Sequence, residues 1–388
     1  MFGLFNLGRA SAGFVAVLVG YTSSAAIIFQ AANSLGASAA EVTSWFWALG
    51  IGLSVLTIGL SWWFRSPVMM AWSTPGAALL VTGLQDLSMA EAVAVFLLSS
   101  VLILITGLTK LFDRLMRLIP GPIAAAMLAG VLLRFGLDVF VSLQSQPWLV
   151  GIMLLVYLVL KPLLPRYCVP LTLVAGLVVA LVQGDTHFAE VSWQMAQPHW
   201  VTPEWNWSAM IGVGVPLFLV TMASQNMPGL AVIRAHGYHT PASPIITASG
   251  FVGVLLAPFG GFAYNLAAIT AAICMGEEAD PDPKKRYWAA IWAGIFYALA
   301  GLFAASVVAV FDALPLALVA AIAGLALLAT IGSSLQAAVV DQSYREAAII
   351  TFLVTASGLT IAGIGSAFWG LMIGVLAATV WGSLAKPR

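Results

Sequence analysis

The lysine and arginine residues of this chain fall on alternate connections between long apolar stretches. Fourteen of the 15 cations follow this pattern, and the intervening connections carry acids but almost no bases. Lys and Arg are retained on the cytoplasmic side during membrane insertion, so the pattern predicts a membrane-embedded bundle with an even number of passes and both termini inside. The exception, Arg134, is expected at the outer end of a segment, where its side chain could snorkel to the interface. The cation-bearing connections hold Arg9; Arg65; Lys110, Arg114 and Arg117; Lys161 and Arg166; Arg234; Lys284, Lys285 and Arg286; Arg345; and Lys386 and Arg388.

The composition excludes a soluble domain, because 61% of the residues are hydrophobic and only 8% are charged. A net charge of zero argues against nucleic acid as a partner. The two cysteines, Cys168 and Cys274, have no disulfide or metal-ligand spacing. The first apolar stretch is interpreted as a membrane pass rather than a cleavable signal, because it continues through Ile28.

A spanning helix needs ~20 apolar residues, and on this basis the sequence predicts fourteen segments. Those at 68–84, 244–258 and 260–276 are short for a full span, and the first and last of these contain Pro or Gly. The segments are 12–32, 42–63, 68–84, 91–109, 118–135, 148–164, 168–184, 209–233, 244–258, 260–276, 287–311, 315–332, 346–362 and 366–383.

An internal repeat supports this count. Gly107-Leu108, Pro120 and 126–133 recur as Gly301-Leu302, Pro315 and 321–328, at an offset of 194 or 195 residues. Seven segments per half would place the halves in opposite orientations, an arrangement typical of secondary transporters. Chance similarity between two Ala/Leu/Gly-rich helices is the alternative explanation.

The third segment contains the signals of a helix that begins in mid-membrane. Ser73 and Thr74 can cap a helix, and Pro75 suits its first turn. The residues before Pro75 are expected to be extended. Non-helical backbone at this depth is tolerated only inside protein or beside a cavity.

The tenth segment repeats this pattern, because a Gly-rich lead at 258–264 passes into an Ala-rich helix with Asn265 as a candidate cap. Two such half-helices from inverted repeats would direct their positive N-termini at one point, a site suited to a carboxylate or another anion. The alternative is a pair of kinked helices or re-entrant loops that bind no ligand.

Polar residues also occur in mid-segment at 21–24 and 221–226. For Ser and Thr, hydrogen bonds between helices are the simpler explanation. Adjacent Gln225 and Asn226, before Pro228-Gly229, favour a role at a cavity. No Lys, Arg, Asp or Glu maps to mid-bilayer, so no proton-relay carboxylate is evident. The sequence also has no metal-ligand cluster, P-loop or nucleophile–base pair, which disfavours an enzyme or an ATP-driven pump and implies no cofactor.

Four ordered motifs, at 71–80, 221–229, 267–274 and 355–370, resemble the benzoate/proton symporter (BenE-type) family of bacterial inner membranes. The resemblance runs nearly end to end. It implies the fold of the nucleobase and sulfate permeases: an all-α polytopic membrane protein of 14 transmembrane segments in two inverted repeats of 7, with short strands before the half-helices of segments 3 and 10. The implied domains are a core at 1–117 and 209–311, a gate at 118–185 and 312–388, and an outer loop at 186–208.

The implied function is secondary active transport of benzoate or a related aromatic carboxylate, coupled to protons, with the core moving against the gate. The implied partners are the substrate, the proton, the lipid bilayer and a second copy in a homodimer; the implied location is the bacterial inner membrane. Nucleobase permeases carry acids at positions that correspond here to Ser224 and about Ala263. Their absence suits an anionic substrate and leaves the route of the proton open.

The candidate substrate-binding residues come from segments 1, 3, 8 and 10. These candidate residues are Tyr21, Ser24, Trp72, Thr74, Gly76, Ser224, Gln225, Asn226, Gly261, Phe262, Ala263, Tyr264, Asn265 and Leu266.

Two alternative functions remain. One is transport of an inorganic anion or a nucleobase by a protein of the same fold, and the other is an ion channel.

Overall fold

A computed structural model describes residues 7–112, 120–164, 167–186, 194–277, 279–361 and 366–384. Arg114, Arg117, Arg166, Lys386 and Arg388, which contribute to the charge pattern, lie outside the described residues. Seven helices in the described chain are long and apolar enough to cross a membrane, by length and composition. An eighth span is formed if the pair Pro283–Leu302 and Ala304–Asp312, bent by 66°, crosses as one unit.

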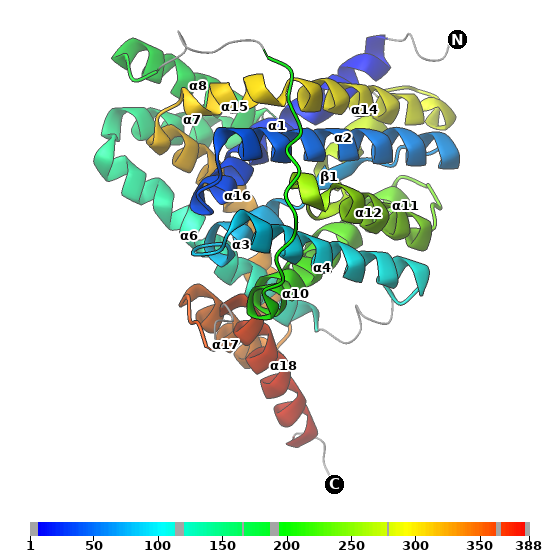
Figure 1. The fold of residues 1–388 in the computed structure, drawn as a ribbon, viewed down its shortest axis with the longest axis vertical. Coiled ribbons are helices and arrows are strands. Elements are labelled where there is room, and N and C mark those ends of the chain that lie inside the picture. Colours follow the sequence, from blue (N-terminus) through cyan, green and yellow to red (C-terminus); the bar gives the residue numbers. More distant parts are fainter. Residues whose placement is uncertain are drawn as a thin grey trace.

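The helices pack into one bundle, in which they run in several directions (Figure 1). The first half contains α1 (Leu7–Ser34), α2 (Ala39–Phe64), β1 (Met70–Trp72), α3 (Thr74–Gly83), α4 (Met89–Leu108), α6 (Gly121–Ser145), α7 (Pro147–Leu163) and α8 (Cys168–Gln183). The second half contains α9 (Trp207–Ala209), η2 (Met210–Gly214), α10 (Val215–Thr221), η3 (Met222–Asn226), α11 (Met227–Ala235), α12 (Ala242–Leu256), η4 (Ala257–Phe259), β2 (Tyr264–Leu266), α13 (Ile269–Met275), η5 (Pro283–Lys285), α14 (Tyr287–Leu302), α15 (Ala304–Asp312), α16 (Leu316–Val339), α17 (Arg345–Ala356) and α18 (Ser366–Leu384).

Capping boxes fix where α2 and α4 begin. The Ser38 and Ser88 hydroxyls accept hydrogen bonds from the backbone N–H groups of Glu41 and Glu91. Each glutamate in turn accepts from the backbone N–H of its serine. These reciprocal bonds satisfy two otherwise unpaired donors at each helix start, and the carboxylate lies near the positive end of the helix dipole.

Small residues bring the helices into close contact. A Cβ atom added to Gly50 of α2 would lie 2.6 Å from Cα of Gly301 in α14, and one added to Gly250 of α12 would lie 2.4 Å from the backbone N of Leu104 in α4. Lipid gives little hydrophobic drive for helix association, so close backbone approach at small residues stabilises such pairs. The pairs α2–α14 and α4–α12 therefore form tightly packed seams.

Residues 194–206 form an extended strap across one side of the bundle (Figure 1). The backbone N–H of Ala196 donates to the Leu302 carbonyl (2.8 Å), and that of Val201 donates to the Pro258 carbonyl (2.8 Å). The N–H of Glu204 donates to the Ala90 carbonyl (3.0 Å). The strap thereby joins the ends of α14, η4 and α4. Of the predicted outer loop, 187–193 lie outside the described residues.

The fifth segment is longer than predicted. The sequence analysis ended it at residue 135, whereas α6 continues to Ser145. Arg134 therefore lies within the helix, and Asp138 follows one turn later, where the Arg134 charge attracts its carboxylate. Opposite charges four residues apart, together with exposed Leu137 and Phe140, allow the helix to continue. The prediction that Arg134 lies at the end of the segment is wrong.

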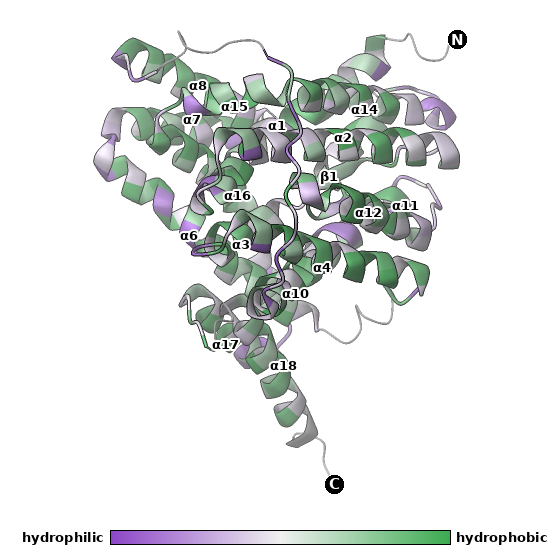
Figure 2. Ribbon diagram, viewed as in Figure 1, coloured by the Kyte–Doolittle hydropathy of each residue, from purple (hydrophilic) through white to green (hydrophobic). Residues whose placement is uncertain are grey.

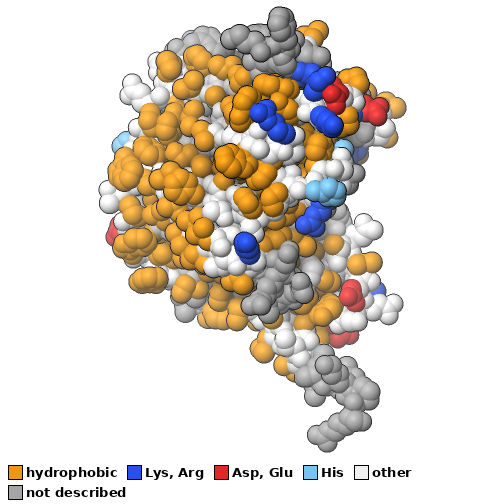
Figure 3. Space-filling model, turned by 90° about the vertical axis from the view of Figure 1, so that its right-hand side faces the viewer, with side chains coloured by type: hydrophobic (Ala, Val, Ile, Leu, Met, Phe, Trp, Pro, Cys, Tyr) orange, Lys and Arg blue, Asp and Glu red, His pale blue; other side chains and the backbone are white. Residues whose placement is uncertain are grey.

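Most helices are rich in hydrophobic residues (Figure 2), and hydrophobic side chains cover much of the face seen in Figure 3. Large hydrophobic side chains such as Trp63 (80% exposed), Val182 and Leu376 project outwards. An apolar surface of this extent has no stable place in water but suits contact with lipid chains. The structure is thus that of a membrane protein with several apolar spans.

Candidate binding site at the paired strands

Two short strands from the two halves of the chain meet inside the bundle. β1 and β2 pair in antiparallel register, with Ala71 opposite Asn265. The pairing extends at both ends, because the N–H of Ser73 donates to the Ala263 carbonyl (3.1 Å) and that of Ala267 donates to the Met69 carbonyl (2.9 Å). These mutual hydrogen bonds satisfy non-helical backbone that would otherwise be costly at this depth.

The helix after β1 begins as the sequence predicts. Ser73 is the N-cap of α3, and its hydroxyl accepts a hydrogen bond from the N–H of Gly76 (3.0 Å). Pro75 lies in the first turn, where its missing N–H costs nothing. The positive end of the α3 dipole is therefore fixed next to the strand pair. Thr74, the first residue of α3, lies at this end and is half-buried.

The helix after β2 differs from the prediction. α13 begins at Ile269 and has no side-chain cap, whereas Asn265 was the candidate cap. Asn265 instead lies within β2, where its amide N–H donates to the carbonyl of Ala263 (2.9 Å). A residue in the strand ladder cannot also adopt the cap position several residues later. The prediction of Asn265 as a helix cap is wrong.

The polar group of the eighth segment occupies a π-helical turn, η3, instead of a break at Pro228-Gly229. The side-chain oxygen of Asn226 accepts a hydrogen bond from the N–H of Leu266 in β2 (3.0 Å). Its amide N–H donates to the Met222 sulfur (3.2 Å). Asn226 is therefore committed to holding β2 against η3. Its neighbours Ser224 and Gln225 are only half-buried, because the wider π turn directs them elsewhere.

A cavity of about 700 Å³ lies beside this arrangement. Its wall combines α1, the β1–α3 junction, η3, the β2–α13 junction and α14 with α7, α8 and α16. Within the described chain, Lys161 is its only charged lining residue. The lining residues are Val19, Gly20, Ser24, Ala71, Trp72, Thr74, Pro75, Lys161, Val169, Pro170, Ser224, Gln225, Pro228, Ala267, Ala268, Thr270, Ile273, Tyr297, Ala326, Leu327, Ala329, Thr330 and Ser333.

Trp72 is the fixed aromatic wall of this cavity. Its indole N–H donates to the Ser24 hydroxyl (2.6 Å), which itself donates to the Gly20 carbonyl (2.7 Å). The ring of Tyr21 meets Trp72 edge-on, with ring centroids 4.7 Å apart. These contacts hold the indole in one orientation, so it presents a rigid apolar surface to the cavity, which Tyr297 also lines.

Several polar groups on the cavity lack a protein partner. Thr270 Oγ1 is buried and makes no hydrogen bond. Neither the Thr74 hydroxyl nor the Gln225 amide hydrogen-bonds to another described residue. Buried polar groups are normally satisfied, so the free Thr270 hydroxyl, with the half-buried Thr74 and Gln225 on the same cavity, indicates a place where a ligand completes the hydrogen bonding. The described residues hold no cluster of His, Cys, Asp or Glu suited to a metal ion.

Five of the candidate residues line the cavity: Ser24, Trp72, Thr74, Ser224 and Gln225. The other candidates support the site from behind or lie elsewhere. Phe262 is buried against Trp45 and Phe96, and the Tyr264 hydroxyl donates to the Ala48 carbonyl (2.7 Å). The candidates away from the cavity lining are Tyr21, Gly76, Asn226, Gly261, Phe262, Ala263, Tyr264, Asn265 and Leu266.

Among the lining residues that the sequence analysis missed are Lys161, Thr270 and Tyr297. Thr270 belongs to one of the four motifs, next to the irregular lead of segment ten, and this proximity could have identified it. Lys161 was assigned to a connection because it is charged. Tyr297 lies in an otherwise apolar helix and has no distinguishing local signal.

Half-helices that follow a buried strand pair and face a cavity between groups of membrane helices define a membrane transporter fold. The chain is similar to the transmembrane domain of a cyanobacterium bicarbonate transporter, BicA, with a TM-score of 0.59, 13% identity and coverage of 96% of each chain. It is also similar to SLC26A9, with a TM-score of 0.65, 12% identity and coverage of 97% of this chain and 66% of that one. These likenesses establish the fold alone.

The chain belongs to the family of benzoate membrane transport proteins, whose profile matches residues 4–380. It is 52% identical over 363 residues to the inner membrane protein YdcO of Escherichia coli K12, covering 94% of this chain and 93% of that protein. It is 42% identical over 384 residues to the benzoate membrane transport protein of Acinetobacter baylyi, covering 99% and 97%. The family resemblance is thus confirmed, and the chain is a membrane transport protein, not an enzyme.

Proposed function

We propose that this protein is a secondary active transporter of benzoate or a related aromatic carboxylate, and that the cavity is its substrate site. One observation carries the proposal: the cavity combines an aromatic wall with unpartnered hydrogen-bonding groups, and its lining within the described chain includes one lysine and no acid. This combination matches a flat apolar ring that bears a single negative charge. The family relationship to a benzoate membrane transport protein supports the same conclusion.

In this proposal the carboxylate occupies the polar side of the cavity. Thr74 at the start of α3, Gln225 on η3 and Thr270 on α13 can each donate to a carboxylate oxygen. The dipole of α3 adds a favourable interaction of about 0.3–1 kcal/mol. The ring then lies against Trp72 and Tyr297, which offer apolar surface without competing for the charge.

We also propose fourteen membrane segments in two inverted repeats of seven. The packing supports this. If each segment is replaced by the segment at the same position in the other half (n by n + 7), a pair of helices in contact becomes another pair in contact. Thus α2–α14 corresponds to α12–α4, α1–α13 to α10–α3, and α7–α8 to α17–α18. The β1–β2 ladder lies on the axis of this exchange, since each strand maps onto the other.

The proposal also includes a core at 1–117 and 209–311 and a gate at 118–185 and 312–388. The cavity lies between these parts, since α1, α3, η3, α13 and α14 face α7, α8 and α16 across it. A substrate bound there contacts both parts, so rocking of the core against the gate would expose it to alternate sides. A homodimer assembled through the gate is part of the same proposal.

We place the protein in a bacterial inner membrane, with the cavity open towards the cytoplasm. Lys161 near the end of α7 and Ser333 near the end of α16 line the cavity next to cation-bearing connections. Cysteine labelling of intact cells tests the orientation. A cysteine at position 284 should be protected from an impermeant reagent, and one at position 204 should react; reaction at position 284 from outside would refute it.

Proton coupling requires a carrier for the proton. No Asp, Glu or His lines the cavity within the described chain, so the substrate carboxyl group is the carrier that this proposal assigns. Uptake by proteoliposomes should then be driven by an inward proton gradient. A gradient of sodium alone should have no effect, and uptake driven by sodium would refute proton coupling.

The substrate class is tested by a thermal-shift panel on purified protein, with benzoate, benzamide, uracil, bicarbonate and sulfate. Benzoate should stabilise the protein, because a ligand that binds only the native state raises its unfolding free energy. Benzamide keeps the ring and removes the charge, so it should stabilise far less. If uracil or an inorganic anion stabilised the protein and benzoate did not, the substrate would be that ligand and the proposal for benzoate would be wrong.

A further inference from the structure

A second pocket, of about 610 Å³, lies where α2 ends and α14 begins. It is lined by Arg65, Gly237, Tyr238, Pro283, Lys284 and Tyr287. Figure 3 looks onto this side of the molecule, and Lys and Arg side chains are spread over it. The pocket is separate from the transport cavity, because no described residue lines both.

The guanidinium of Arg65 is held in place. Its Nη1 donates to the Tyr287 hydroxyl (2.8 Å). Its central carbon lies 4.4 Å from the ring centroid of Trp62 and 5.3 Å from that of Tyr287. Such contacts orient a guanidinium without neutralising it. The other N–H groups remain available as a planar fork suited to a phosphate.

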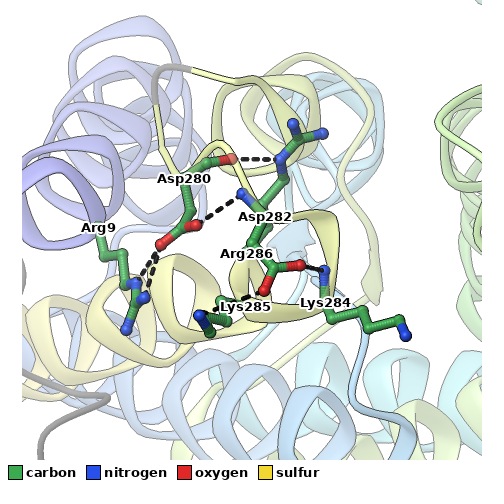
Figure 4. Close-up of polar contacts among 6 residues, drawn as sticks. All are labelled: Arg9, Asp280, Asp282, Lys284, Lys285 and Arg286. Carbon is green, nitrogen blue, oxygen red and sulfur yellow. Dashed lines mark hydrogen bonds and ion pairs between the residues drawn. The ribbon is translucent and has the colours of Figure 1, made fainter.

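The nearby acids are already paired with other cations (Figure 4). Asp280 forms a buried ion pair with Arg9 (2.6 Å), and Asp282 pairs with Lys285 (3.3 Å). The N–H of Lys284 also donates to the Asp282 carboxylate and is the main cause of its lowered pKa. The Lys284 side chain points away from this group in Figure 4 and has no ion-pair partner among the described residues.

The pocket thus contains two cations and no acid among its described lining residues. It also lies at the depth of the membrane surface. Trp62 and Trp63, 49% and 80% exposed, end the apolar part of α2 directly before Arg65. Exposed tryptophans are typical of the boundary between lipid chains and head groups. A phosphate in the pocket would therefore lie beside surfaces that suit acyl chains.

We propose that this pocket binds the phosphate head group of an anionic membrane lipid, with Arg65 and Lys284 as its charge partners and Trp62 and Trp63 against its chains. A basic pocket between membrane helices at the cation-bearing face is a typical site for such lipids. A lipid, rather than free phosphate, is assigned because the tryptophan surfaces adjoin the cations.

The test is native mass spectrometry of the purified full-length protein titrated with phosphatidylglycerol or phosphatidylcholine. The wild type should retain phosphatidylglycerol in preference to phosphatidylcholine. Arg65→Gln and Lys284→Gln should each weaken retention about fivefold, which corresponds to about 1 kcal/mol for one surface cation. Arg65→Gly is a second variant at the same position; since φ is +50° there, glycine adopts this backbone conformation without strain, and thermal unfolding of the variant checks that it is folded.

Lys110→Gln is the matched control. Like Arg65, Lys110 follows a spanning helix and has a positive φ (56°), but it does not line the pocket. Retention in this variant should equal that of the wild type. An equal loss in Lys110→Gln would mean general surface charge and would overturn the site. Inorganic phosphate should stabilise the detergent-solubilised protein less than phosphatidylglycerol does. Equal stabilisation by the two would show a site for free anions and would overturn the lipid assignment.

Discussion

The side-chain oxygen of Asn226 accepts the backbone N–H of Leu266 at 3.0 Å, and this bond links the π-helical turn of the eighth segment to strand β2. Asn226 is 1% exposed and Leu266 is fully buried, so no water competes for the bond. Ser224 and Gln225, on the same turn, line the cavity. The bond thus sets the position of two cavity residues relative to the strand pair.

Replacing Asn226 with alanine should lower the unfolding free energy by about 1–3 kcal/mol, because the buried N–H of Leu266 loses its acceptor. Asn226→Gln keeps an uncharged amide whose oxygen can still accept this bond, and it should lose less. Thermal unfolding of both purified variants measures the difference. Stability of Asn226→Ala equal to that of the wild type would show that the bond is not needed to hold β2.

Placing a carboxylate at Ser224 should weaken binding of benzoate far more than binding of benzamide. Two like charges ~4 Å apart repel by about 4 kcal/mol at an effective dielectric constant of ~20. The introduced acid can be neutralised through a raised pKa, so affinity should be measured by calorimetry across pH. Ser224→Asn supplies a side chain of similar size without charge. If Asp and Asn reduce benzoate affinity equally at high pH, the effect is steric and the anion-site interpretation fails.

Lys161 should contribute to anion affinity through its charge. It lies near the end of α7 on the cavity lining, with its ammonium 5.5 Å from the ring centroid of Tyr157. Because the side chain is exposed, Lys161→Gln should weaken benzoate binding only about two- to fivefold, the scale of an exposed charge pair. The effect should shrink with added salt. Lys110→Gln, away from the cavity, should leave affinity unchanged; equal losses in the two variants would remove Lys161 from the site.

Gly229 should be intolerant of a side chain. A Cβ there would lie 2.4 Å from Cβ of Leu266, so Gly229→Ala must push α11 away from β2 at a cost of about 1–3 kcal/mol. A Cβ at Gly59 of α2 would meet no other part of the described chain within 4 Å, so Gly59→Ala should be neutral or stabilising. Thermal unfolding compares the two. Similar stability of both variants would contradict the close approach of the eighth segment to the strand.

The sequence predicted the features that depend on local signals. Ser73 and Pro75 indicated the start of α3, because capping and proline preferences act within one turn. Charge alternation and apolar runs indicated the membrane segments. The extent of α6 was mispredicted, because the charges of Arg134 and Asp138 resemble a segment end in the sequence, although both residues lie inside one continuous helix.

The side-chain directions at the site could not be predicted from sequence. Phe262 and Tyr264 looked as suitable for an aromatic ligand as Trp72, but they face Trp45, Phe96 and the Ala48 carbonyl inside the core. Which way a residue of a short strand points depends on the register of its partner, and that partner lies in the other half of the chain. Tyr297 reaches the cavity only because α14 packs beside α1.

The most direct test of the central claim is uptake of radiolabelled benzoate by proteoliposomes that contain the purified protein, compared with the Gln225→Leu variant under an inward proton gradient. Gln225 is chosen because it lines the cavity and bonds to no other described residue, so leucine removes a ligand contact without breaking a structural one. The account predicts saturable uptake by the wild type, inhibited by unlabelled benzoate and not by benzamide, and a strong reduction in the variant. Absence of wild-type uptake, or equal uptake by a folded Gln225→Leu protein, would contradict it.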